Sequence, residues 1–237
     1  MSWFKQGEEG EKFLQEEKER RQKQAEASNN IKNWRFKLAK DVTGQVVFLD
    51  DLYFFFSEHQ FYANDSYYNY ETCIDDIEGE CPLCENGNRP SIVAVTTIID
   101  FTQHKKKDGT FTDKPTKKPM VLKQGGTERL LKRQKKLGGL TYRKFEVYRS
   151  SDPKGEATGT DIDYEKEVDV EDLKKFAPEG VDPNEWIKPF DYAEMFQPKT
   201  APELRKILGI PEPAGSDHEA TNSEYGVETK DKLADLI

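Results

Sequence analysis

The stretch SIVAVTTIIDF, Ser91–Phe101, is a continuous run of apolar and β-branched residues in a chain of 237 residues that is 34% charged. β-Branched side chains fit the surface of a pleated sheet. An apolar run without polar alternation is typical of a strand that is buried on both faces. The sequence therefore predicts a buried strand here, with the rest of a β-sheet around it.

The segments before this run also have strand patterns. Trp34–Leu38 alternates apolar and cationic residues, DVTGQ supplies a turn, and Val46–Leu49 returns as a second strand, so we expect a hairpin. A third apolar run ends at His59, and a tyrosine-rich run leads to Cys73. These runs add strands to the predicted sheet.

The segments after the run predict one helix and one more strand. Thr127–Leu137 has a helical pattern, with Thr127 as its cap and Gly138–Gly139 as its stop. Leu140–Ser150 alternates like a strand, and the segment after Ser150 has the composition of a loop. About five strands with a helix before the last one match a small Greek-key barrel, so we predict a mainly β protein with an OB-fold and short helices.

Composition limits the location and the chemistry of the three cysteines. The chain has no apolar run of about 18 residues, and its first residues lack the layout of a signal peptide, so we expect a cytoplasmic protein without membrane contact. Disulfides are rare in that compartment, and three cysteines cannot pair evenly. Metal binding is therefore the favoured interpretation of Cys73, Cys81 and Cys84.

The motif Cys81-Pro-Leu-Cys84 has the spacing of a zinc knuckle. Cys73 offers a third thiolate, and His59, next to an apolar strand, offers a fourth ligand. Thiolate and imidazole ligands favour Zn²⁺ over harder cations, and four protein ligands make a structural site. Two alternatives stay open: His59 is an ordinary histidine and an aspartate or water completes the site, or the two-cysteine motif is a redox pair.

Four segments follow from these patterns. Residues 1–30 have the pattern of a charged helical arm, and residues 31–200 form the expected OB-fold core, with an inserted zinc-ribbon-like subdomain at about 57–90. Residues 201–210 form a short helix that begins with a capping box. Residues 211–237 form an acidic disordered tail.

Charge is distributed in blocks of opposite sign. Net charges are +3 for residues 1–40, −11 for 41–100, +11 for 101–149 and −12 for 150–237, which together give −9. A basic block on this scale indicates a polyanionic partner, although a charge run is more simply a solvated face. The candidate nucleic-acid-binding residues are Lys105, Lys106, Lys107, Lys114, Lys117, Lys118, Lys123, Arg129, Lys132, Arg133, Lys136, Tyr142, Arg143, Lys144, Tyr148 and Arg149.

Aromatic residues crowd the segment that contains the metal motif. Nine of them lie within residues 53–70. Flat side chains beside a cationic surface are typical of proteins that bind single-stranded nucleic acid without reading its sequence.

The chain resembles the zinc-containing single-stranded DNA-binding proteins of tailed phages, of the helix-destabilising type of phage T4. The resemblance rests on His59, Cys73 and the knuckle Cys81/Cys84 in an aromatic-rich segment, on the segments MSWFKQG and CPLCENGNRPS, and on the order of the parts. It implies an OB-fold core with one structural Zn²⁺, and self-association on DNA through the N-terminal arm. It also implies that the acidic tail recruits replication and recombination proteins.

Other functions have weaker support. The first alternative is a zinc-ribbon transcription regulator or adaptor that acts mainly through protein contacts. An Mg²⁺-dependent hydrolase would need paired carboxylates such as Asp50–Asp51 or Asp75–Asp76, but neighbouring strand residues point to opposite faces, and aspartates are common in turns. No catalytic motif is present, so we do not expect an enzyme.

Overall fold

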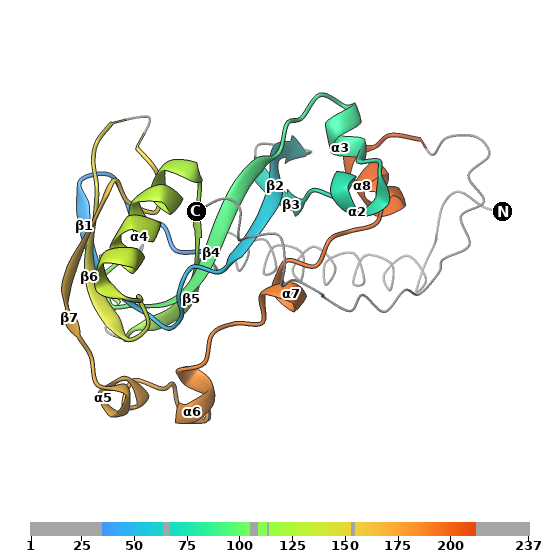
Figure 1. The fold of residues 1–237 in the computed structure, drawn as a ribbon. Helices are drawn as coiled ribbons and strands as arrows, with labels where there is room; N and C mark the ends of the chain where they lie inside the picture. Colours follow the sequence, from blue (N-terminus) through green and yellow to red (C-terminus); the bar gives the residue numbers. More distant parts are fainter. Residues whose placement is uncertain (1–34, 64–66, 105–108, 113, 153–154, 212–237) are drawn as a thin grey trace.

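The chain folds around one antiparallel β-sheet of seven strands, with short helices at its edges (Figure 1). This is a computed structural model, and it describes residues 35–63, 67–104, 109–112, 114–152 and 155–211. The prediction of a mainly β protein is confirmed. The expected arm, residues 1–30, lies outside the described residues, as does all of the expected acidic tail except Pro211.

The elements follow the chain in this order. The strands are β1 (Val42–Phe48), β2 (Phe54–Ala63), β3 (Tyr67–Thr72), β4 (Ser91–Asp100), β5 (Thr116–Leu122), β6 (Arg143–Arg149) and β7 (Asp161–Glu167). The helices are α2 (Asp75–Glu78), α3 (Pro82–Glu85), α4 (Gln124–Leu137), α5 (Val170–Lys174), α6 (Pro183–Trp186), α7 (Tyr192–Met195) and α8 (Ala201–Leu208). The strand order in the sheet is β3-β2-β4-β1-β6-β7, and β5 pairs with β4.

β4 is the central strand, because it pairs with β1, β2 and β5. Its residues 91–95 pair with β2, and its residues 98–100 pair with β1. β5 pairs with residues 94–100, so it takes the edge of β4 that β1 and β2 leave free. β1 and β2 therefore follow one another along the same edge, separated by Leu49–Tyr53.

β4 is buried on both faces, as its unbroken apolar run predicts. Every residue from Val93 to Asp100 is buried. Ala94 and Ile98 belong to the main core, which also contains Phe48. Ile99, on the opposite face, belongs to a second cluster. The main core consists of Phe36, Leu38, Val46, Phe48, Leu52, Ala94, Ile98, Met120, Leu122, Leu130, Leu140, Phe145, Val147 and Ile162.

β2, β3 and the first half of β4 extend away from the main core as a three-stranded ribbon (Figure 1). The ribbon is defined here as residues 54–63, 67–72 and 91–95. The far end of the ribbon carries α2 and α3. The Cys81/Cys84 motif therefore lies at a distance from the main core, on an insertion between β1 and the second half of β4.

α4 contacts β4, β5 and β7 and contributes Leu130 to the main core. It begins at Gln124, three residues before the predicted start, and Thr127 does not cap it. Its predicted end is confirmed, because Gly138 has φ 72 and closes the last turn.

The early start of α4 depends on a carboxylate from the loop between β6 and β7. Glu156 Oε1 accepts a hydrogen bond of 2.9 Å from the Gly126 amide, which satisfies one of the free donors of the first turn. A Cβ atom on Gly126 would lie 2.6 Å from Glu156 Oε2. The pair Gly125–Gly126, which a sequence pattern treats as a helix break, thus leaves room for the carboxylate.

The predicted hairpin around DVTGQ is wrong. The turn comes earlier, at Asp41 with φ 56, and Val42–Phe48 is one continuous strand. Gly44 lies inside this strand because its neighbours leave no space for a side chain. A Cβ atom there would lie 2.4 Å from Thr102 Oγ1 and 2.7 Å from Leu38 Cδ2. Packing, and not turn geometry, explains this glycine.

β7 is a strand that the sequence pattern did not indicate. It pairs with β6 from Asp161 to Glu167, but Ile162 is its only buried residue. An edge strand that buries one side chain has no apolar periodicity, so its sequence resembles a loop. Its acidic residues matter for the charge of the neighbouring surface.

The residues after β7 form a strap that crosses the sheet and then follows the ribbon (Figure 1). This C-terminal strap is defined here as residues 168–210. Its short helices α5, α6 and α7 each begin at an aspartate, Asp169, Asp182 or Asp191, whose side chain accepts a hydrogen bond from a backbone N–H of the first turn. The predicted capping box at the start of α8 is confirmed.

Candidate metal centre and charged surfaces

Four side chains from the ribbon and the loops at its end converge on one point. His59 lies in β2, and Cys73 directly follows β3, whose pairing places Thr72 opposite Glu58. Cys81 and Cys84 flank a tight turn in which the Glu85 amide donates to Cys81 O at 2.9 Å. The hairpin register and this turn together bring the histidine and the three sulfurs into one cluster.

The distances in the cluster suit one tetrahedral ion. His59 Nε2 lies 3.4 Å from Cys81 Sγ and 3.6 Å from Cys84 Sγ, and Cys73 Sγ lies 3.7 Å from Cys84 Sγ. All four atoms lie within 4.8 Å of one another. Metal–ligand bonds of about 2.0 and 2.3 Å in tetrahedral geometry would put nitrogen–sulfur pairs about 3.5 Å apart and sulfur pairs about 3.8 Å apart. The predicted convergence of the four residues is confirmed, and the cluster could hold one metal ion.

The hydrogen bonds of His59 leave one ring nitrogen free for a metal. Its Nδ1 lies 2.9 Å from Asn88 Oδ1. The Asn88 amide nitrogen donates to Gln60 O at 3.0 Å, so the amide oxygen must face the ring. The proton of neutral His59 is therefore on Nδ1, and Nε2 presents its lone pair to the sulfurs.

Burial controls the acidity of the thiols. Burial, followed by the hydrogen bond to Cys73 and the charge of Cys81, raises the pKa of Cys84 to about 12. Burial likewise raises the pKa of Cys73. Metals bind the thiolate, so a cation must be present to keep these sulfurs ionised at neutral pH. The donor set suits a thiophilic divalent ion, and the four ligands leave no position for a substrate.

Carboxylates balance much of the predicted cationic surface. The ion pairs are Lys118–Asp100 at 2.8 Å, Arg129–Glu156 at 3.5 Å, Arg133–Asp163 at 2.7 Å, Arg143–Glu167 at 3.1 Å and Lys144–Glu165 at 3.1 Å. Apart from Asp100, these carboxylates belong to β7 or to the loop before it. The basic block and the acidic block that follows it therefore meet in space and partly neutralise each other.

Other predicted cations contact neutral groups. The Lys117 ammonium donates to Glu185 O at 3.2 Å and lies 4.7 Å from the centre of the Phe190 ring. Lys123 donates to Gln60 Oε1 at 3.1 Å, and Arg149 donates to a backbone carbonyl. These side chains hold elements of the fold together.

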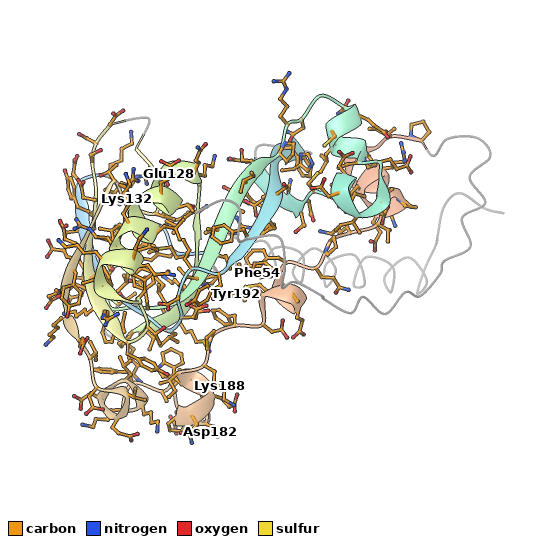
Figure 2. All side chains as sticks on the ribbon, viewed as in Figure 1. Phe54, Glu128, Lys132, Asp182, Lys188 and Tyr192 are labelled. Carbon is orange, nitrogen blue, oxygen red and sulfur yellow. The ribbon has the colours of Figure 1, made fainter. Side chains whose placement is uncertain are left out.

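Three further predicted cations also have no acidic partner among the described residues. Within the described ranges, Lys114, Lys132 and Lys136 are exposed and have no carboxylate within ion-pair distance. Figure 2 labels Lys132 on α4. Lys105, Lys106 and Lys107 lie outside the described residues.

α4 presents different side chains to β7 and to the segment between β1 and β2. Arg133 pairs with Asp163 on β7, whereas Gln134 accepts a hydrogen bond of 2.8 Å from the amide of Leu52, between β1 and β2. Leu131 lies one turn before Gln134 and is 37% exposed. The side of α4 that carries Leu131 is therefore turned toward Leu52 and away from the carboxylates of β7.

The aromatic residues divide into packed and exposed rings. The ring centres of Phe54 and Tyr192 lie 5.3 Å apart, and those of Phe56 and Phe196 lie 4.8 Å apart. Figure 2 labels Phe54 and Tyr192. These rings attach the strap to the ribbon. Tyr142 packs in the second cluster, and the Tyr148 hydroxyl bonds Asp41 Oδ1 at 3.3 Å. By contrast, Tyr53 is 74% exposed and Phe55 is 37% exposed.

Sequence reasoning missed three kinds of residue. Asn88, which orients His59, lies in a polar loop where no pattern separates it from Asn86. The exposed Ile92 lies inside an apolar run, and only the structure shows that 70% of its surface is accessible. The residues of β7 that neutralise the basic block also carried no signal beyond their acidity.

No helix in the described parts of the chain has the length and hydropathy to cross a membrane. Comparison of the chain with protein-family models, with curated proteins and with solved structures gave no match.

Proposed function

We propose that this chain is a sequence-independent single-stranded DNA-binding protein that acts in phage DNA replication, recombination and repair. The observation that carries the proposal is the connectivity of the sheet. Without the ribbon, the order is β1, β4, β5, α4, β6, β7, and β1 pairs with both β4 and β6. Five strands in this arrangement support an OB-fold.

The ribbon is then an insertion between the first and second strands of the OB-fold. In that fold, oligonucleotides bind to the face of strands two and three. They also contact the loop between strands one and two and the loop between strands four and five. The insertion would thus form one wall of the binding site. Its thiolate-rich cluster supports a zinc subdomain with one structural Zn²⁺ held by His59, Cys73, Cys81 and Cys84.

The strap covers one face of the ribbon and of β4. Tyr192 and Phe190 both bond Thr97 Oγ1, at 2.6 and 3.0 Å, and Phe54 and Phe56 pack on rings of the strap. DNA on this face would first have to displace the strap. The other face of the ribbon is the better candidate.

That other face carries exposed apolar side chains. Phe55 pairs with Ala94, and Ile92 pairs with Ser57, so Phe55 and Ile92 project from the same face of the ribbon. α4 lies on this side of the sheet, because Ala94, which pairs with Phe55, shares the main core with Leu130 of α4, and Gln134 accepts a hydrogen bond from the Leu52 amide. We call this the α4–ribbon surface; its residues are Tyr53, Phe55, Ile92, Lys123, Leu131 and Lys135.

Flat side chains next to cations offer bases a stacking surface and phosphates a counter-charge. Each stacked base contributes about 1–3 kcal/mol, so Phe55→Ala should weaken binding of single-stranded DNA roughly 5- to 150-fold. Phe176→Ala is the matched control, because Phe176 is also exposed (44%) but belongs to the strap.

The test is fluorescence anisotropy with labelled oligo-dT and with a duplex of the same length over a salt series. We expect the single strand to bind more tightly, with a slope of about −0.7 per phosphate contacted. Equal affinity for the two DNAs, or equal effects of the two phenylalanine substitutions, would contradict the proposal.

The neutralised cations favour one second candidate, a zinc-ribbon adaptor or transcription regulator. The pairing of Arg133, Arg143 and Lys144 with carboxylates leaves less positive charge for DNA than the sequence suggests. An adaptor would bind a protein partner after nuclease treatment and would not bind free oligo-dT.

The residues before and after the described core would have roles of their own. Residues 1–30 would mediate self-association on DNA, and residues 211–237 would recruit replication and recombination proteins. Truncation at either end separates these roles from DNA binding by the core, because each truncation leaves the described core intact.

A further inference from the structure

α8 packs on the metal cluster rather than on the main core. Ala201 and Leu204 are buried in one small cluster with Cys73, Cys81 and Leu83. Ile207 and Leu208 complete the apolar side of the helix against the same residues. The surface under α8 thus consists of metal ligands and their immediate neighbours.

The polar contacts of α8 reach the same short stretch of chain. Glu71 accepts from Lys199 just before the helix, and Glu78 accepts from the Ala201 amide at 3.3 Å. Arg205 pairs with Glu85 at 3.3 Å. These contacts all end within residues 71–85, which contain three of the four candidate ligands.

None of these pieces is long enough to keep its shape alone. α2 and α3 have four residues each, and α8 has eight. Isolated helices shorter than about 12 residues are marginal in water. A bound ion would fix the three sulfurs and the histidine at tetrahedral positions, and so would fix the loops on which α8 rests.

We propose that metal occupancy of the His59–Cys73–Cys81–Cys84 cluster controls whether α8 is docked on the ribbon. When the metal leaves, the loops 73–90 lose their fixed shape and α8 detaches. The strap before it stays in place up to Phe196, because Phe196 packs on Phe54 and Phe56 and its carbonyl accepts from Thr72 Oγ1 at 2.8 Å.

Release of α8 detaches the residues after Phe196 from the ribbon. Residues 197–211 would add up to about 50 Å of reach when fully extended. Anything that binds residues 212–237 would then be held on a longer tether than when α8 is docked. The inference rests on the proposed metal and does not depend on DNA binding.

The test is hydrogen–deuterium exchange of the full chain, with bound Zn²⁺ and after removal of the metal with a chelator and a reducing agent. We expect the amides of residues 201–208 to lose at least tenfold protection, while peptides from β4 and β6 change less than twofold. Leu204→Ser should cause the same loss with one equivalent of metal still bound. Lys206→Ser, on the exposed side of α8, is the matched control.

Three results would overturn the inference. They are an α8 that is equally protected with and without metal, an α8 without protection in the metal-bound protein, and loss of protection in the whole sheet together with α8. Because the readout contains no DNA, failure here is distinct from failure of the proposed function.

Discussion

Asn88→Ala provides the most specific test of the metal centre, because it removes a partner of a ligand and leaves all four ligands in place. The substitution deletes the 2.9 Å contact that holds the proton on His59 Nδ1 and the 3.0 Å bond that orients the amide. His59 is 0% exposed, so water cannot readily replace the lost acceptor. The ring then has a buried unpaired donor or adopts the wrong tautomer.

The expected loss follows from these contacts. Removal of an outer partner of a histidine ligand typically lowers metal affinity 10- to 100-fold, which is about 1.4–2.7 kcal/mol. Binding and folding are linked, so the free energy of unfolding in excess metal should fall by the same amount. A further ~1 kcal/mol, for the bond from Asn88 to Gln60 O, should be lost with or without metal.

Competition with a chromophoric chelator measures the metal affinity, and denaturant unfolding with and without metal measures the stability. Asn86→Ala is the control, because Asn86 is exposed and belongs to the same loop. If Asn88→Ala binds the metal within twofold of the unmodified protein, or if Asn86→Ala has the same effect, the assigned role of Asn88 is wrong.

Three other substitutions test the packing of the sheet. Tyr192→Phe removes the 2.6 Å hydrogen bond to Asp50, a partly buried carboxylate whose pKa is already raised by desolvation, and urea unfolding should show a loss of about 1.5–3 kcal/mol. Burial raises the pKa of Asp100, but its hydrogen bonds and the nearby Lys118 charge lower it to about 2 from 3.8. The contribution of Asp100 to the free energy of unfolding is therefore present above pH 4 and disappears as the pH falls toward 2. Asp100→Asn should cost about 2 kcal/mol of stability at pH 7 and little at pH 2 in unfolding experiments. Gly44→Ala should lower stability by about 1–3 kcal/mol in thermal unfolding, because the new Cβ overlaps Thr102; an unchanged melting temperature would refute the close approach.

The charge pattern shows how a correct observation from sequence can lead to an overestimate. The net charge of +11 for residues 101–149 is real. Pairing along the edge of the sheet nevertheless places Glu165 and Glu167 next to Lys144 and Arg143. Net charge is a property of composition, but the field at a surface depends on which segments lie side by side.

The sequence by itself determined the features that depend on residue chemistry and short spacing. The candidate metal ligands could be named because thiolates and imidazole are rare and chemically distinct, and because two cysteines at the spacing of Cys81 and Cys84 form a tight turn in many contexts. The buried strand Ser91–Phe101 and the capping box of α8 could be predicted because hydrophobic patterns and helix caps are local properties of the sequence.

Only the tertiary structure decided the features that depend on contacts between distant segments. Asn88 meets His59 across 29 positions, and Glu156 caps α4 across 30. Gly44 is required by Thr102, and β7 exists because β6 offers it an edge. Such contacts depend on strand register and on the path of the strap, and the periodicity of a single segment determines neither of them. For that physical reason, the candidate ligands could be identified from the chain alone, whereas their support and the charge of the surrounding surface could not.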